Sequence, residues 1–187
     1  MKRLMAMLTM PALAGCLTST PPAVSHWPVE FKGAGNAESA PVYGVARVSQ
    51  VTVRAPYGAE GIAVMRSGGT LETDAYNLFA AAPALLLKGV VFDALTASGK
   101  FSAVVNSSSS AVSAVSVEVM VTRLALDCRE GGGRKAVAET LLRLVRGGEI
   151  VFAATGEGEA DAAAGNYGAS FSRAVSAALS EALGEIK

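Results

Sequence analysis

Histidine is almost absent from this chain, since His26 is the only one in 187 residues. It cannot form a histidine metal cluster, and no nucleophile, base and acid assemble around it into a triad. The serine run at 107–110 has no positioned base, and no serine sits in a nucleophile elbow. We interpret acidic residues such as Asp93 and Asp161 as solvated charges. The sequence therefore predicts a protein that is not an enzyme and needs no metal or cofactor.

An excess of charge of either sign is also missing, because 16 Lys and Arg residues balance 16 Asp and Glu residues. No basic face or arm appears, so we do not expect a nucleic-acid partner. The segment Glu130–Arg134 contains three glycines but lacks the Gly-Lys-Ser/Thr ending that opens a helix in phosphate-binding loops. We expect a turn there.

An apolar run of the roughly 20 residues that a membrane-spanning helix needs is absent as well. The chain begins with a short basic segment and a shorter apolar one, which end in the lipobox Leu13-Ala14-Gly15-Cys16. This order of basic segment, apolar segment and lipobox predicts a lipoprotein signal peptide at 1–15. Diacylglycerol and palmitate-type acyl chains on Cys16 would then anchor the protein to a membrane. The alternative is an ordinary secretory signal with a chance cysteine.

The residue after the lipobox and the second cysteine refine this expectation. Leu17, rather than Asp, follows Cys16, so the inner-membrane retention signal of enteric bacteria is missing and we expect the periplasmic side of the outer membrane. With Cys16 acylated, Cys128 has no disulfide partner. We interpret Cys128 as a small strand residue near a turn rather than a reactive thiol.

Residues 16–40 are rich in Pro, Ser, Thr, Gly and Ala, and predict a tether after the lipidated cysteine. Within it, His26–Phe31 reads either as a short aromatic strand or as a loop that places Trp27 on the domain. Residues 41–187 are long enough for one good core, so we expect a single domain there.

The first half of this domain shows clear periodicities. Residues 42–53 predict a long strand, and the segments at 62–65 and 70–72 flank a Ser-Gly-Gly turn typical of a hairpin. A helix is predicted from Pro83 to about Ser98, with a left-handed cap at Gly99 and a strand at 101–105. Its apolar stripe consists of Leu87, Val90, Val91, Ala94 and Leu95.

The second half predicts a loop at 106–114, a strand at 115–128 whose apolar phase shifts as at a bulge, and strands from 135 and 150 joined by Gly147-Gly148. A final helix is expected from about Ala169, with Ser172 and Ser176 on its solvent side. We therefore predict an α+β fold, ordered β-β-β-α-β-β-β-β-α. It consists of a single antiparallel sheet of about six or seven strands with two amphipathic helices packed on one face.

The block from residue 54 to residue 104 resembles the ABC-type transport auxiliary lipoprotein component family. The resemblance rests on Arg54-Ala55-Pro56-Tyr57, on Ile62–Met65, on Phe79 ahead of Pro83, and on Ala97-Ser98-Gly99-Lys100-Phe101 ending in Val104. It implies the architecture just described. It also implies partners, namely an ABC transporter ATPase and permease and an MCE-type substrate-binding protein, and for some members a homo-oligomeric ring.

The function implied by the resemblance is an auxiliary, non-enzymatic role in the transport of lipids or other hydrophobic molecules. The surface expected to bind a partner contains Arg54, Pro56 and Tyr57, and the alternative interpretation is a proline turn whose tyrosine caps the core. A different class of function stays open, which is a structural or assembly lipoprotein of an outer-membrane complex with no transport substrate.

Overall fold

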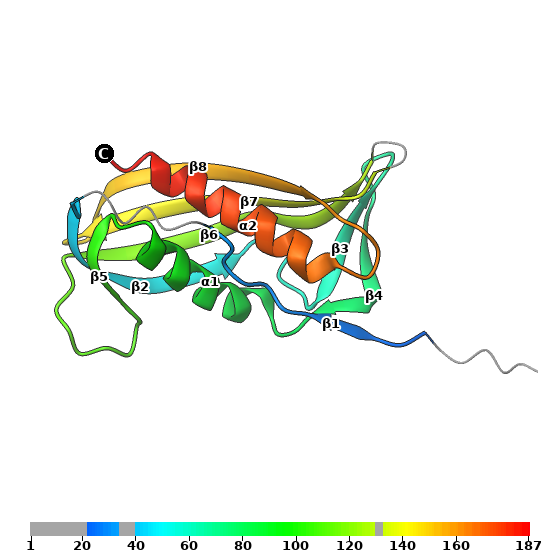
Figure 1. Ribbon diagram of the computed structural model, residues 1–187, viewed down its shortest axis with the longest axis horizontal. Coiled ribbons are helices and arrows are strands. Elements are labelled where there is room, and N and C mark those ends of the chain that lie inside the picture. The colour runs from blue at the N-terminus through cyan, green and yellow to red at the C-terminus, as the bar shows by residue number, and fades with distance from the viewer. Residues whose placement is uncertain (1–21, 34–39, 130–132) are drawn as a thin grey trace, which may run out of the picture.

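The computed structural model describes residues 22–33, 40–129 and 133–187. Within these ranges the chain forms eight strands and two helices, one strand more before the first helix than expected (Figure 1). The strands are β1 (Ser25–Trp27), β2 (Tyr43–Val53), β3 (Gly61–Arg66), β4 (Leu71–Phe79), β5 (Phe101–Val105), β6 (Val115–Cys128), β7 (Lys135–Arg146) and β8 (Glu149–Asp161). The helices are α1 (Pro83–Ala97) and α2 (Tyr167–Gly184).

Some predictions fall outside the part of the chain that is described. The predicted signal peptide, Cys16 and Leu17 lie there, and so does most of the turn predicted at Glu130–Arg134. Among the residues that are described, neither helix is long and apolar enough to cross a membrane.

Strand β6 is the centre of the sheet. Along one edge it pairs in parallel with two successive strands, first with β2 and then with β3. Along its other edge it pairs antiparallel with β7, which pairs antiparallel with β8. β5 lies beside β2, β4 lies beside β3, and β1 lies outside β4. The three strands β6, β7 and β8 are the antiparallel meander that the glycine turns predicted.

The sheet is mixed and has eight strands, so the prediction of a purely antiparallel sheet was wrong. The cause is physical, because alternation of apolar residues fixes which side chains face the core but not which strand lies alongside. Both β2 and β3 run parallel to β6, since the turn at residues 54–60 returns the chain to the same edge of β6. The prediction of about six or seven strands was also too low, because it did not count the short β1.

A bulge in β6 accounts for the shift of apolar phase seen in the sequence. Val121 pairs with Thr140 and Arg123 pairs with Glu139, which leaves Thr122 as an extra residue. An extra residue in one strand of a pair shifts the alternation by one position. The valines before the bulge and the leucines after it therefore face the same core, and the predicted bulge is confirmed.

Helix α1 agrees with its prediction in position and in orientation. It begins at Pro83 and ends at Ala97, and Gly99 follows with a positive φ of 67°. A positive φ is strained for other residues, so glycine suits this position. All five residues of the predicted stripe are buried: Leu87, Val90, Val91, Ala94 and Leu95.

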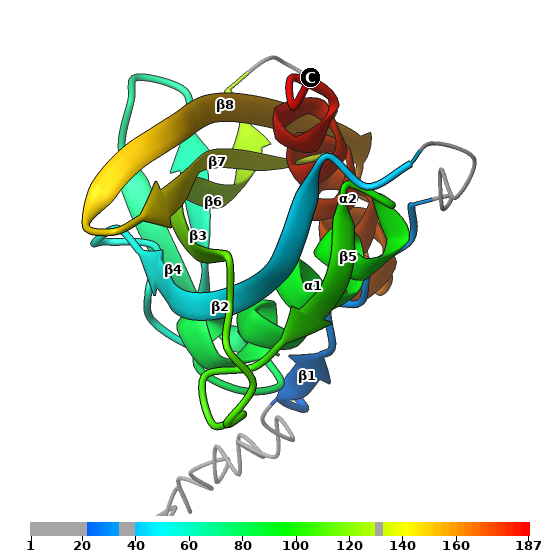
Figure 2. The same cartoon turned by 90° about the vertical axis from the view of Figure 1, so that its left-hand side faces the viewer.

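Helix α2 lies against β7 and β8, and it occupies the same side of the curved sheet as α1 (Figure 2). It begins at Tyr167, slightly before the predicted start. Its approach to β8 is close, because a Cβ atom at Gly156 would lie 1.9 Å from the carbonyl oxygen of Ala178, and one at Gly158 would lie 2.0 Å from that of Ala174. The glycines are thus what allows the helix backbone to rest on β8.

The segment that follows β1 lies along α2 and corrects one prediction about this helix. Ser172 and Ser176 were expected on the solvent side, yet both are buried. The hydroxyl of Ser172 accepts a hydrogen bond from the backbone N–H of Glu30 at 3.0 Å. The hydroxyl of Ser176 accepts one from the backbone N–H of Lys32 at 2.7 Å. Residues 25–33 therefore form a strand first and then a strap over the helix, so each alternative for this segment is partly right.

Trp27 fixes the start of this strap to two elements. Its indole N–H donates to the side-chain oxygen of Asn77 at 3.0 Å, and its ring meets Tyr167 edge-on with centroids 5.7 Å apart. Asn77 is in turn held by the carboxylate of Asp74. Burial opposes ionisation of that carboxyl, but N–H groups of Tyr76 and Asn77 outweigh it, so the pKa of Asp74 lies below its usual value.

Candidate functional site

The face of the sheet that points away from the helices, here called the outer face, carries half-buried side chains of mixed character. Helix-facing residues of β6 and β7 are buried in the main core, and the residues between them point to the outer face. A small depression of about 110 Å³ lies on this face. It is lined by Gln50, Thr52, Glu118, Val119, Met120, Leu141 and Arg143.

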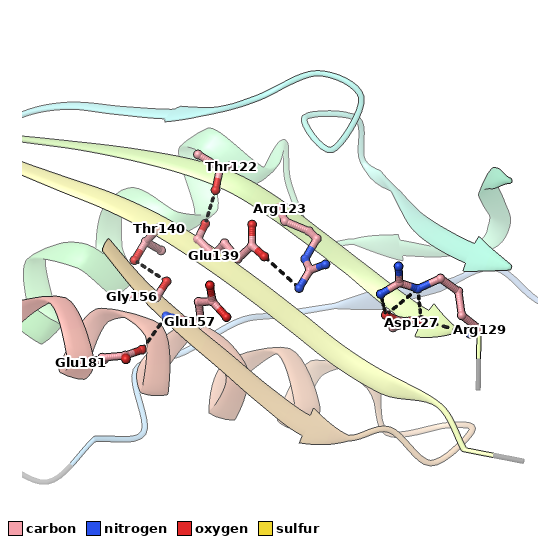
Figure 3. Close-up of polar contacts among 9 residues, drawn as sticks. All are labelled: Thr122, Arg123, Asp127, Arg129, Glu139, Thr140, Gly156, Glu157 and Glu181. Atoms are coloured by element: carbon pink, nitrogen blue, oxygen red, sulfur yellow. Dashed lines mark hydrogen bonds and ion pairs between the residues drawn. The ribbon is translucent and has the colours of Figure 1, made fainter. Parts of the chain in front are cut away.

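An ion pair lies beside this depression, at the bulge of β6. The guanidinium of Arg123 lies 2.8 Å from the carboxylate of Glu139, with 24% and 31% of the two side chains exposed (Figure 3). The Nε atom of Arg123 is buried and has no hydrogen-bond partner among the described residues. Glu157 follows in the same cross-strand row, since it pairs with Glu139. Arg123, Glu139 and Glu157 thus occupy neighbouring positions on three adjacent strands, and the ion pair joins the first two.

The turn at residues 54–60 connects β2 to β3. It projects from the edge of the sheet at the point along β6 where pairing with β2 ends and pairing with β3 begins. The backbone N–H of Arg54 donates to the carbonyl of Val121 at 2.9 Å, the last bond before the chain leaves β6. The N–H of Tyr57 donates back to the carbonyl of Arg54 at 2.9 Å and closes the turn. The peptide bond before Pro56 is cis. Arg54 and Pro56 are exposed, whereas Tyr57 is half-buried.

Tyr57 connects this turn to the outer face. It packs on a second, smaller apolar cluster made of Ala63 in β3, Ala125 in β6 and Val137 in β7. Ala125 is two residues beyond Arg123 on the same strand, so the turn lies next to the ion pair. The structure therefore brings the three predicted residues together in one turn at the border of the outer face, and their role in partner binding stays a prediction.

Sequence reasoning did not find the ion pair, although one signal pointed to it. The phase shift within Val115–Cys128 locates the bulge, and Arg123 is the charged residue that follows the extra residue. At the end of β6, Asp127 pairs with Arg129 (Figure 3). The hydrogen bonds from the Arg129 guanidinium hold the pKa of Asp127 below its usual value.

The remaining candidate groups are scattered. In residues 22–33, 40–129 and 133–187, no three His, Cys, Asp or Glu side chains gather as a metal site would require. Cys128 is half-buried at the end of β6, and Asp93 and Asp161 are exposed. The absence of enzymatic activity stays a prediction.

Comparison with known proteins finds a solved structure with a similar fold. No known family and no curated relative matches the sequence. The crystal structure of protein XCC0632 from Xanthomonas campestris, of family DUF330, is similar to the chain at 20% identity and a TM-score of 0.61, covering 88% of this chain and 89% of that one. The chain therefore has the mixed α/β fold of a DUF330 protein.

Two further solved structures are less similar. One is the PelC dodecamer from Paraburkholderia phytofirmans, at 15% identity and a TM-score of 0.47, covering 81% of this chain and 92% of that one. The other is a lipoprotein of Caulobacter crescentus CB15, at 18% identity and a TM-score of 0.35, covering 55% of this chain and 76% of that one. At these TM-scores neither supports a statement about function.

Proposed function

We propose that the protein is a lipid-anchored envelope lipoprotein on the periplasmic side of the outer membrane. It serves as the auxiliary, non-catalytic component of an ABC-type, MCE-like transport system for lipids or other hydrophobic molecules. The lipobox ending in Cys16 and the family-like block around Arg54 support the role. The anchor is tested by incorporation of labelled palmitate, which Cys16→Ser should abolish.

The observation that carries the docking role is the position of the 54–60 turn at the border of the outer face. Exposed Arg54 and Pro56 stand beside a patch that combines apolar side chains with a half-buried ion pair. Such a mixture of aromatic, arginine and apolar groups is typical of the centre of a protein interface. The partner is the ATPase and permease complex or its MCE-type substrate-binding protein.

The test is affinity purification of the tagged, lipidated protein from native membranes, with bound proteins identified by mass spectrometry. Arg54→Glu reverses an exposed charge at the turn, and Arg143→Glu reverses a half-buried charge on the outer face. Arg173→Glu is the matched control, because Arg173 is exposed on α2, away from this face. We expect recovery of transporter subunits to fall at least about tenfold for the first two variants and to stay unchanged for the control.

Two results would count against the proposal. If Arg54→Glu and Arg143→Glu retain the transporter subunits fully, the outer face is not the docking surface. If the unsubstituted protein recovers only outer-membrane assembly components, the structural lipoprotein becomes the better description. The native mass of the purified complex reports how many copies of the chain assemble.

A further inference from the structure

A groove on the helix side of the molecule is separate from the outer face. It lies between the exposed side of α1 and the loop at 106–114 that connects β5 to β6. Its volume of about 420 Å³ falls within the range typical of small-molecule pockets. It is lined by Val48, Leu85, Lys88, Gly89, Phe92, Asp93, Asn106, Ser107 and Ser108.

The floor of the groove is apolar and partly open to solvent. Leu85 and Phe92 come from α1, and Val48 comes from β2 beneath them. Leu85 is 69% exposed, so its side chain offers apolar surface to a ligand. One turn further along the helix, a Cβ atom at Gly89 would meet no heavy atom within 4 Å. An acyl chain lying here would therefore bury apolar surface without displacing any side chain.

One wall of the groove is polar and carries a cation. The Lys88 ammonium donates to the hydroxyl of Ser107 at 3.0 Å, which uses one of its three donors. The loop that carries Ser107 is held by Arg47, whose guanidinium donates to the carbonyls of Asn106, Ser109 and Ala111. The cation and the hydroxyl groups are thus positioned before any ligand arrives.

Asp93 forms the opposite wall. Lys88 and Asp93 are five residues apart in one α-helix, which separates them by about 140° around its axis. The carboxylate of Asp93 repels an anion at its own wall, while Lys88 attracts one at the other. The groove is therefore polarised across its width, with the apolar floor between the two charges.

We propose that this groove binds a single acyl chain that ends in an anionic group, as in a free fatty acid. The anionic group pairs with Lys88 and the hydroxyl of Ser107, and the chain lies over Leu85, Gly89 and Phe92. The inference deepens the transport role proposed above and rests on it for its biological meaning. Binding itself is measured without any transport partner.

The experiment uses the full-length lipidated protein in nanodiscs and a palmitate analogue that carries a diazirine, with its methyl ester as the uncharged probe. After irradiation, labelled peptides are mapped by mass spectrometry. Gly89→Leu fills the groove, because that position faces open space. Gly184→Leu is the matched control, since Gly184 is also helical and a Cβ atom there also meets nothing within 4 Å.

We expect label on the peptides that contain residues 85–93 and 106–108. Gly89→Leu should lower it about tenfold, since a few methylene groups in a pocket change discrimination by that order. Gly184→Leu should leave it unchanged. Lys88→Gln should reduce labelling by the free acid to the level seen with the methyl ester. Unaltered circular dichroism and melting of each variant confirm the fold.

Label spread evenly over the chain, or label that survives Gly89→Leu, would overturn the proposal. So would equal labelling by the acid and the ester in the unsubstituted protein, because Lys88 would then contribute no selectivity. These results are distinct from those of the docking experiment. A protein that captures transporter subunits without binding the probe retains its docking role and loses only this ligand.

Discussion

The close contact between α2 and β8 makes a sharp stability prediction. A Cβ atom at Gly156 would lie 1.9 Å from the carbonyl oxygen of Ala178, about 1.5 Å short of an ordinary van der Waals contact near 3.4 Å. The obstacle is backbone, so it cannot rotate away as a side chain would. Gly156→Ala therefore forces the helix off the strand by about this distance.

The size of the destabilisation follows from the packing contacts of α2 that such a displacement weakens. A gap of about 0.5–1 Å already forfeits a quarter to a half of a dispersion contact, and α2 carries a long row of fully buried residues. We expect Gly156→Ala to lower the free energy of unfolding by about 3 kcal/mol, the upper end for overpacking. Gly158→Ala should cost as much, because its Cβ would lie 2.0 Å from the Ala174 oxygen.

The assay is equilibrium denaturation followed by the fluorescence of Trp27, the only tryptophan, whose ring contacts Tyr167 of α2. The corresponding fall in Tm is about 6–12 °C for a domain of this size. The double variant should cost clearly less than the sum, since one movement of α2 relieves both clashes. Gly89→Ala, which meets open space on α1, is the control and should be neutral or slightly stabilising.

The reasoning would be refuted if either single variant unfolded within about 0.5 kcal/mol of the unsubstituted protein, the range of ordinary surface changes. Strict additivity of the two substitutions would also contradict it. In that case the two glycines would act separately on the strand, and a shared displacement of the helix would not be the cause.

Two further predictions concern the N-terminal strap and the hairpin beside it. Ser176→Ala removes the acceptor of the Lys32 backbone N–H, so it should destabilise by about 1 kcal/mol and speed hydrogen exchange at that amide, whereas Ser180→Ala on the exposed side should do neither. Because folding lowers the pKa of Asp74, its stabilising contribution is present above the unfolded value of about 3.9 and is lost as pH falls through the folded value. Asp74→Asn should therefore flatten the acid limb of stability against pH, and an unchanged limb would contradict the assignment.

Local elements were predictable because their causes are local. The stripe of α1, its proline start and the glycine after its end lie within one short segment, and all three hold in the structure. The bulge in β6 was readable because it shifts the apolar phase within a single strand. In each case the residues that decide the structure are close neighbours along the chain.

Features that depend on distant partners were not predictable from pattern. Parallel pairing of β2 and β3 with β6 is decided by where the 54–60 turn returns the chain, which alternation does not encode. Ser176 looked like a solvent residue because helical periodicity does not show that a strap more than a hundred residues away needs a hydrogen-bond acceptor. The same limit applies to Arg123 and Glu139, which meet only through strand register.

Strand β2 joins the two proposed surfaces while keeping them separate. Val48 points to the helix side and contributes to the floor of the groove, whereas Gln50 and Thr52 point to the outer face. Side chains on opposite faces of a strand do not touch, so substitution at one surface leaves the other intact. Ligand binding and partner docking can therefore be removed one at a time, and a transporter that loses function with Gly89→Leu while still recovering its subunits would show that the groove, and not the docking surface, carries the cargo.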